Sequence, residues 1–565
     1  MTRIIPELCV SVGARTGVPP RRWMCLHLGL ALPALWGPAA AQEQSIAGHS
    51  ARTAAHLDSL DVVASDAYLA GGMHRFLLGG KYRRVWAAPV RVPILDLHRY
   101  AGGLVPVERG GGFQTRSLRL RSADGREFRF RSLDKDPAQK LPERLRTRTI
   151  ESLVRDQTSA LHPGGALAAA GLANAAGVPA PRPHLVLMPD DPALGEFRQE
   201  FAGMLGTIEV HPEGGRDHSP GFSGFRDVVD TDELVPKLNA GPDDRVDARA
   251  YLTARLLDMF INDWDRHQGN WRWGTRDQNA PRRWVAIPKD RDQVFAGYGG
   301  ALLDVVRLRD PRLVPFTPDY KLKGLTSNGA ALDRRFLAEL ERPVWDSIAH
   351  ALQSKLTDSV IAEALGRMPA PYQELTDNEI TATLRTRRAR LPAAAAAYYT
   401  QLARVVDVHA TNAAELVRVR HQPDGRVELT LERRLAGASP PHFRRTFVPD
   451  ETREVRVYLH GGNDGVAVNG GSRARIQVRV IAGKGEDSLP DARTATGVRT
   501  YEVPGDTSWY PPDSLVEPAL DRRPWATGIN GEREPPAVDF GGRFAPSFGA
   551  GYASELGLVL RAGVG

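Results

Sequence analysis

Two residues that could serve one reaction stand five positions apart near the middle of the chain. They are the aspartate and the asparagine of Asp265-Arg-His-Gln-Gly-Asn270. A carboxylate can accept the proton of an attacking hydroxyl, and an amide oxygen can ligate Mg²⁺. Because Mg²⁺ keeps several waters, one amide and one further carboxylate are enough to hold it. The spacing therefore predicts metal-assisted chemistry, with aspartates that cap a turn as the structural alternative.

The further carboxylate is available at the end of a predicted strand. Residues 284–287 form an apolar run that leads into Pro288-Lys-Asp290-Arg-Asp292, and residues 251–261 before the loop are apolar at helical spacing. A helix, a loop and a strand would thus bring these polar residues together. Asp290 is the preferred metal ligand because it lies directly at the strand end, and Asp292 is the second candidate. Solvated turn residues are the structural alternative for both.

The first 41 residues have the organisation of a secretory signal. Arg21-Arg22 precede an apolar run over residues 23–36, and Ala39–Ala41 supply a small-residue cleavage site. Both cysteines of the chain, Cys9 and Cys25, lie in this segment. Cleavage after Ala41 would leave an exported chain without a thiol. That excludes a disulfide scaffold, a Cys-ligated zinc site, an iron–sulfur cluster and a thiol nucleophile.

The composition indicates a globular chain without a nucleic-acid partner. The 565 residues are 42% hydrophobic and 25% charged, which excludes wholesale disorder and allows a sizeable core. The net charge is +7, and the first 41 residues contribute four arginines and one glutamate, so the remainder carries 7 − 3 = +4. The basic residues form no run of the kind that binds nucleic acid. No later stretch approaches the ~20 apolar residues of a membrane helix.

Residue patterns predict an α+β fold with several parts. Alternating runs around the turn signal Ala123-Asp-Gly125 predict a hairpin early in the chain, and long helical patterns follow. Period-two strands with Gly/Asp turns then predict an all-β module. In chain order we expect a signal segment (1–41), a polar lead (42–80), a β-rich lobe (81–215), a helical lobe (216–406), the β module (407–500), and a linker with a final strand-like segment (501–565).

Two glycine- and aspartate-rich turns stand in the β module. Gly461–Gly465 and Gly483–Asp487 resemble the turns of calcium-binding repeats. Only two copies occur, and Gly and Asp are turn residues in any case, so ordinary β-turns are favoured.

The residues around the loop resemble several kinase families. Asp265-Arg-His-Gln-Gly-Asn270 resembles the DRHxxN catalytic loop of phosphoinositide kinases and of atypical kinases. Ile287–Phe295 is similar to the IPWDxDxxFG segment of CotH-type spore-coat kinases, and Thr207–Pro212 resembles the hinge of HipA-like kinases. These resemblances imply a bilobal, protein-kinase-like domain.

A closer resemblance covers residues 81–491. This stretch resembles an exported bacterial family in which a kinase-like region precedes a surface-antigen, BamA-type outer-membrane β-barrel. Gly110–Leu120, Arg131–Pro137 and Asp156–Pro163 carry the match. Residues 547–564 would then be the first barrel strands, but a barrel needs at least eight strands of ~10 residues, so a truncated barrel is expected. The resemblance implies the periplasm or outer membrane of a Gram-negative bacterium as the location.

The resemblance also implies a role for each residue of the loop and the strand end. Asp265 would be the catalytic base, and Asn270 and Asp290 would ligate the metal, with Asp292 as the second choice. A glycine cluster in the β-rich lobe would cover the phosphates through backbone amides, although an ordinary hairpin turn is the alternative. The cluster is Gly110, Gly111 and Gly112.

The phosphate-binding cation is open between two residues. Lys135 is preferred, and Arg131 is the alternative because a guanidinium also binds phosphate well. Glu151 or Asp156 on the following helix would pair with the cation. Two residues of the hinge-like segment, Glu209 and Val210, would offer backbone groups to the nucleotide base.

The function expected from these residues is phosphoryl transfer with Mg²⁺ (or Mn²⁺) as cofactor and ATP as co-substrate. The acceptor would be a hydroxyl on a protein, glycan or lipid at the cell envelope. A catalytically silent kinase fold, acting as a structural module of an outer-membrane protein, is the alternative because ATP is scarce outside the cytoplasm. A surface protein that binds through the β module is a third hypothesis.

Overall fold

The computed structural model describes residues 58–502 apart from 111–114, 141–146, 216–220, 309–310, 435–439, 471–474 and 491–496. Beyond residue 502 it describes short strands between 516 and 564. The predicted signal segment, residues 42–57 of the polar lead, Gly111 and Gly112 lie outside the described residues. No helix in the described part is long and apolar enough to cross a membrane.

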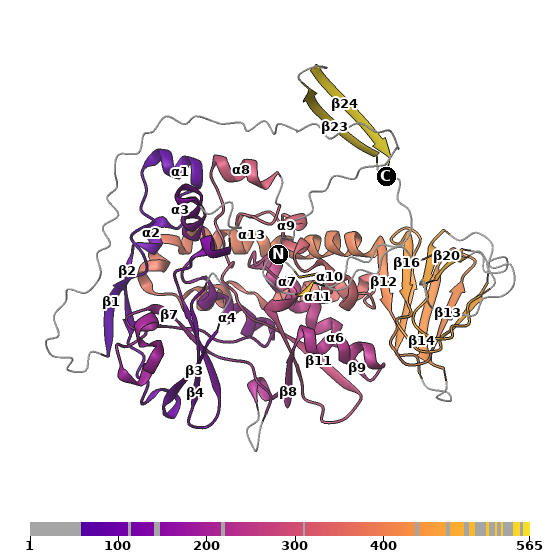
Figure 1. Cartoon of the computed structure of the whole chain (residues 1–565), viewed down its shortest axis with the longest axis horizontal. Coiled ribbons are helices and arrows are strands. Elements are labelled where there is room, and N and C mark those ends of the chain that lie inside the picture. Colours follow the sequence, from indigo (N-terminus) through magenta and orange to yellow (C-terminus); the bar gives the residue numbers. More distant parts are fainter. Residues whose placement is uncertain are drawn as a thin grey trace, which may run out of the picture. The chain divides into compact units, whose positions relative to one another are not determined.

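Helices and sheets are both abundant, which confirms the α+β class (Figure 1). The chain begins with β1 (Ser59–Val63) paired to β2 (Pro89–Pro93), with α1 (Gly72–Leu78) and α2 (Arg83–Trp86) between them. A five-stranded antiparallel sheet follows in the order β3-β4-β5-β7-β6. Its strands are β3 (Leu104–Gly110), β4 (Ser117–Ser122), β5 (Glu127–Ser132), β6 (His184–Leu187) and β7 (Leu205–Val210). Two helices, α3 (Arg148–Asp156) and α4 (Gly165–Ala176), separate β5 from β6.

Strict alternation explains the predicted hairpin of β4 and β5. Leu118 and Leu120 on β4 and Phe128 and Phe130 on β5 are buried in one core cluster, whereas the arginines between them face the other side. Gly125 closes the turn at φ 82°, a conformation that glycine adopts without a steric penalty. This sheet therefore presents a row of arginines on one face.

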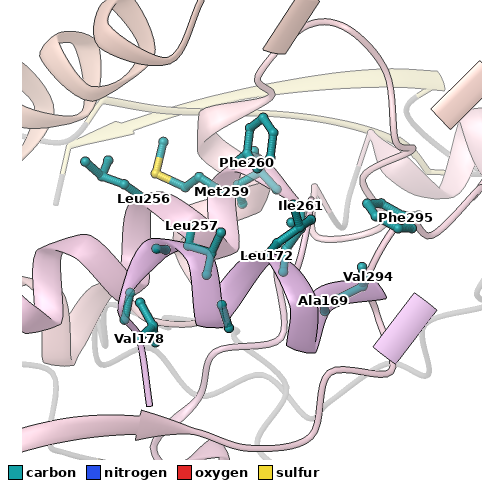
Figure 2. Packing of buried hydrophobic residues seen from close by; sticks show 14 of the residues in the cluster. Ala169, Leu172, Val178, Leu256, Leu257, Met259, Phe260, Ile261, Val294 and Phe295 are labelled. Carbon is teal, nitrogen blue, oxygen red and sulfur yellow. The ribbon is translucent and has the colours of Figure 1, made fainter. Parts of the chain in front are cut away.

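The helical portion is built around α7 (Ala248–Phe260). Asp247 caps this helix by accepting a hydrogen bond from the Ala250 amide at 2.9 Å. Apolar side chains of α7 pack on those of α4 and on Val294 and Phe295 (Figure 2). Each such side chain contributes about 1.5–3 kcal/mol when fully buried. The remaining helices are α6 (Thr231–Ala240), α8 (Ala301–Arg307), α9 (Leu322–Ser327), α10 (Ala330–Phe336), α11 (Arg342–Lys355), α12 (Asp358–Leu365) and α13 (Ala370–Ala403).

A small sheet in the order β8-β10-β11-β9 lies against α7 and α6. Its strands are β8 (Asp227–Asp230), β9 (Asp244–Val246), β10 (Trp271–Thr275) and β11 (Arg282–Pro288). Trp271 and Trp273 on β10 are fully buried beside Tyr251 of α7, with ring centroids 5.2 and 5.6 Å away. These rings therefore pack in the core.

The β module consists of two sheets. The chain passes from one sheet to the other and back, and each such passage is called a coil here. The strands β12 (Val405–His409), β16 (Glu454–Tyr458), β18 (Gln477–Ile481), β19 (Val498–Glu502) and β20 (Val516–Pro518) pair in parallel in that order. A second sheet has the order β15-β14-β13-β17, from β13 (Glu415–His421), β14 (Val427–Arg433), β15 (Phe443–Phe447) and β17 (Gly465–Asn469), and β13 and β17 are parallel. The sequence predicted strands here but not their parallel pairing. Two further strands, β23 (Pro546–Ala553) and β24 (Gly557–Val564), form an antiparallel hairpin.

An acidic ladder of Glu415, Asp464 and Asp487 joins successive coils at their turns. Asp464 Oδ1 accepts from the Glu415 amide at 2.8 Å, and Asp487 Oδ1 accepts from the Asp464 amide at 2.9 Å. Glu415 Oε2 accepts from the Thr411 amide at 2.6 Å. All three acids are fully buried. These carboxylates satisfy backbone amides, so the Gly/Asp turns have a structural role in stacking the coils.

Asp464 makes the stability of the β module depend on pH. Burial raises its pKa to about 8, and the negative charges of Asp487 and Glu415 act in the same direction against the Glu415 amide and Arg434. An unfolded aspartate ionises near pH ~3.9, so the folded state holds the extra proton between about pH 4 and 8. Stability from this group is therefore complete below about pH 4, falls as the pH rises from about 4 to 8, and is lost above 8. Replacing Asp464 with asparagine is expected to flatten this fall.

Thermal unfolding of wild type and Asp464→Asn across this pH range measures the effect. The matched control is Asp424→Asn, because Asp424 is an exposed turn aspartate of the same module. If the melting temperatures of wild type and Asp464→Asn change with pH in the same way, Asp464 does not carry the extra proton.

Candidate functional site

The loop Asp265–Asn270 is fixed to the end of β11. Asn270 Nδ2 donates to the Asp265 carbonyl oxygen at 2.7 Å, and the Lys289 amide donates to the Asn270 carbonyl at 3.1 Å. Arg266 donates from Nη1 to the Lys289 carbonyl at 2.9 Å and from Nη2 to the Asp290 carbonyl at 2.5 Å. The structure thus brings the loop and the strand-end acid together, as the sequence predicted.

Buried ion pairs support the Asp265–Asn270 loop. Arg266 pairs with Asp263 at 2.8 Å, and Arg291 lies 3.5 Å from Asp263 and 2.9 Å from Asp258. Burial raises the pKa of Asp263 to about 7, although Arg266 opposes the shift. Because Asp263 and Arg266 are fully buried, they support the loop and do not meet a substrate.

The Asp265 side chain is partly exposed, unlike Asp263 and Arg266. A quarter of its side-chain surface is exposed (25%), and Oδ1 accepts a hydrogen bond from Asn328 Nδ2 at 2.5 Å. His267 Nε2 lies 3.9 Å from the same oxygen, which is too far for a hydrogen bond. His267 Nδ1 accepts from the Gly269 amide at 3.1 Å and so shapes the loop. Asn328 was not anticipated from the sequence, since no local pattern marks it.

The two candidate cations meet the two aspartates among the three candidate metal ligands. Arg131 Nη1 lies 2.6 Å from Asp290 Oδ2, and Lys135 forms an ion pair with Asp292. Burial alone would raise the pKa of Asp290, but Arg131 and Lys135 lower it well below the usual range, so the carboxyl is ionised. Both pairings place a cation near the predicted site, and the choice between Lys135 and Arg131 stays open.

The backbone of Asp290 is in the left-handed region, with φ 57°. Aspartate tolerates this conformation better than most residues, but it still costs energy that the surrounding contacts must offset. Arg266 supplies one such contact through the Asp290 carbonyl. Such outliers cluster at functional sites, which supports a role for Asp290.

The cations and the strand-end acids line a cleft that encloses about 790 Å³, including open solvent, whereas Asp265 and Asn270 are not among its lining residues. Arg131, Lys135, Asp290 and Asp292 all face it, as does Lys289. Lys289 was missed from the sequence. Burial and the nearby cations Arg129, Arg131 and Arg272 together lower its pKa to about 8, against the opposing charge of Asp290. Its position directly before Asp290 was the signal that could have identified it.

The predicted helix partners of the cation do not contact it. Asp156 instead forms a two-point ion pair with Arg83, at 2.7 and 2.6 Å, and lies 3.0 Å from His74. Within the described residues, Glu151 forms no ion pair with Arg131 or Lys135. The pairing expected for Asp156 is absent because both of its carboxylate oxygens bind Arg83 of α2. The acid nearest to Arg131 besides Asp290 is Glu209, at 3.9 Å from its Nε.

The hinge-like residues have different surroundings. The Glu209 side chain lines the cleft, and burial raises its pKa although Arg131 opposes the shift. The pairing register directs the Glu209 N–H and C=O toward Arg129 on β5, because His211 donates to Glu127 in the same ladder. The backbone groups of Val210 therefore point away from β5, beyond the last pair of β6 at His184. The backbone groups of Glu209 are therefore engaged by β5 and do not offer themselves to a base as predicted. Val210 lines a second cleft, which shares Glu209 with the first, so its role with a nucleotide base stays a prediction.

The glycine cluster is described only at its first member. Gly110 ends β3 opposite Ser117, so the cluster opens the connection between β3 and β4. Thr115, at the other end of this connection, lines the cleft. A hairpin connection that reaches the cleft is compatible with both earlier interpretations of the glycines.

The chain matches no protein-family model and no curated protein sequence. Several solved structures resemble parts of it, among them two kinases. One is the proinflammatory kinase CtkA of Helicobacter pylori, at 12% identity and a TM-score of 0.27, covering 52% of this chain and 94% of that one. The other is the Golgi casein kinase, at 10% identity and a TM-score of 0.28, covering 60% of this chain and 84% of that one. Similarity at this level establishes neither a family nor an activity.

The donor set fits a small, hard cation. Asn270 commits Nδ2 to the Asp265 carbonyl, which leaves its Oδ1 for a metal, and Asp290 supplies an ionised carboxylate. In the part of the chain that the structure describes, no group of three or more His, Cys, Asp or Glu residues could hold a metal. One amide oxygen and one carboxylate are donors of the kind that Mg²⁺ takes when it keeps several waters.

Proposed function

We propose that the chain binds ATP with Mg²⁺ or Mn²⁺ in this cleft and transfers the γ-phosphoryl group to a hydroxyl. One observation carries the proposal. Arg266 fastens the Asp265–Asn270 loop to the strand end that presents Asp290, and Asp290 faces Arg131 across the cleft. The sheet order β3-β4-β5-β7-β6 ahead of a helical portion supports a two-lobed, kinase-like arrangement.

Each residue has a defined task in this reaction. The Asp265 carboxylate accepts the proton of the acceptor hydroxyl, whose oxygen bonds to the γ-phosphorus. The bond from that phosphorus to the β–γ bridging oxygen breaks, and ADP leaves. Arg131, Lys135 and Lys289 bind and neutralise phosphate oxygens. A magnesium ion held by Asn270 and Asp290 would screen the phosphate charge.

A silent, structural role is the second candidate, and specific contacts favour it. The Arg131–Asp290 and Lys135–Asp292 ion pairs occupy the groups that a nucleotide and a metal would need. The helical portion is also joined firmly to the β module. Arg334 pairs with Asp407 at 2.7 Å, and Arg445 donates to the Ala338 carbonyl at 2.6 Å. A rigid support for neighbouring parts of the protein would have these features.

Calorimetry and thermal unfolding with a non-hydrolysable ATP analogue, with and without Mg²⁺, separate the two candidates. A binding-competent cleft is expected to gain about 2.7 kcal/mol at a ligand concentration of 100 Kd. Transfer is followed with γ-labelled ATP on protein, glycan and lipid acceptors. No binding of the analogue, with or without Mg²⁺, would leave the structural role.

Substitution of the cations identifies the phosphate ligand. Arg131→Met is expected to weaken binding of the Mg²⁺–nucleotide complex about tenfold or more, because a hydrogen bond to a charged group contributes about 1.5–3 kcal/mol. Lys135→Met has the larger effect if the lysine is the main ligand. Arg109→Met is the matched control, since Arg109 is exposed on β3 and pairs with Glu200. Equal affinities for all three variants and wild type would exclude both cations.

We further propose that the chain acts at the cell envelope after removal of residues 1–41. The arginine pair, the apolar run and the alanine site support this proposal. Mass spectrometry of the protein recovered from a Gram-negative periplasm should find Gln42 at the N-terminus. An intact Met1 would count against export.

A further inference from the structure

We propose that Asn328 is the positioning residue of Asp265. It holds carboxylate oxygen Oδ1 so that Oδ2 is presented to the acceptor hydroxyl. This inference rests on the proposed phosphoryl transfer and deepens it.

The contact itself is short and directional. Asn328 Nδ2 lies 2.5 Å from Asp265 Oδ1, although the two residues are 63 positions apart. Since a carboxylate can only accept, the amide nitrogen must be the donor. Among the described residues, Asn328 is the one side chain with a hydrogen bond to the Asp265 carboxylate. Asn328 therefore fixes which oxygen remains available.

The backbone around Asn328 is closely fitted. Asn328 caps the C-terminus of α9, and its neighbour Gly329 lies so close to the buried Arg255 that an added Cβ would be 2.8 Å from Nη2. An added Cβ at Gly324 on α9 would be 2.1 Å from the Pro311 carbonyl oxygen. Real Cβ atoms do not approach other atoms this closely, so a side chain at Gly324 would collide with backbone, and one at Gly329 would displace the end of the buried Arg255 side chain. The residues that flank Asn328 are thus closely packed.

A neutral donor suits a general base. A lysine or arginine in this place would hold the carboxylate with a positive charge and weaken it as a proton acceptor. An amide orients the carboxylate without adding charge. With Oδ1 engaged, the proton of the acceptor hydroxyl passes to Oδ2 as the oxygen–phosphorus bond forms.

Steady-state kinetics on the full chain test the assignment. Asn328→Ala is expected to lower kcat about tenfold, because one hydrogen bond to a charged group is lost, while the Kd of the Mg²⁺–ATP analogue complex and the melting temperature stay near wild type. Asn328→Gln, which keeps the donor on a longer side chain, should recover part of kcat. A purely structural role would change the melting temperature and the Kd together with kcat and would show no recovery.

The control is Ser327→Ala, since exposed Ser327 directs its hydroxyl to the Gly324 carbonyl rather than to Asp265. A kcat of Asn328→Ala equal to wild type overturns this inference and leaves the proposed function standing. A wild-type chain that transfers no phosphate overturns both. Loss of nucleotide binding in Asn328→Ala also overturns the inference, because the amide would then act on the cleft as a whole.

Discussion

An Asp265→Asn variant is expected to lose about 10²–10⁴-fold in the rate of phosphoryl transfer, the contribution typical of general acid–base catalysis. Asparagine has nearly the same shape and keeps an oxygen that can accept from Asn328. It cannot take the proton of the acceptor hydroxyl. The loop is held through the Asp265 carbonyl and through Arg266, so the fold should be unchanged. The measurement is kcat with γ-labelled ATP beside the Kd of a non-hydrolysable analogue.

Asp304→Asn provides the matched control for this change of charge. Asp304 is exposed on α8 and pairs with Arg307, away from the cleft. Wild-type kcat in Asp265→Asn would exclude Asp265 as the base. A fall in nucleotide affinity without a fall in kcat would instead assign the aspartate to binding.

Arg255→Met is expected to destabilise the protein by about 3–5 kcal/mol, the usual effect of removing one partner of a buried ion pair. Arg255 is fully buried and binds Asp333 through Nε at 2.8 Å and Nη2 at 2.9 Å, and Asp258 through Nη1 at 3.2 Å. Methionine leaves both carboxylates without this cation. Tyr251 and Tyr398 donate hydroxyls to Asp333 but carry no charge to compensate it.

Urea unfolding measures this loss as a fall in the midpoint at unchanged slope. Arg249→Met is the control, because Arg249 lies exposed on the same helix. A double variant that also replaces Asp333 with leucine should recover part of the stability, since the unpaired carboxylate is then removed as well. Equal midpoints for Arg255→Met and Arg249→Met would show that the buried pair contributes nothing net.

Local patterns predicted much of the site. The spacing of Asp265 and Asn270, with an apolar helix before them and a strand after, indicated the loop and the strand end correctly because these elements adjoin in the sequence. The turn Ala123-Asp-Gly125 likewise predicted the β4–β5 hairpin. Such signals depend on backbone preferences and on side-chain alternation over a few residues.

Long-range pairings could not be predicted in this way. Asp156 meets Arg83, 73 residues earlier, and Asn328 meets Asp265, and neither pair shares a helix face or a strand register. The parallel coils were also missed, because alternation with a period of two is the same in parallel and antiparallel strands. Only the three-dimensional packing decides between such partners.

The acidic ladder gives the β module the character of a stack of interchangeable units. In each coil, a turn carboxylate accepts a hydrogen bond from a backbone amide of a neighbouring coil. The residues that align the coils therefore lie within the turns themselves. The extra β14–β15 hairpin between the first two coils shows that long insertions leave this registration intact. Whole coils could therefore be gained or lost during evolution, changing the reach of the protein while the cleft around Asp265 keeps its geometry.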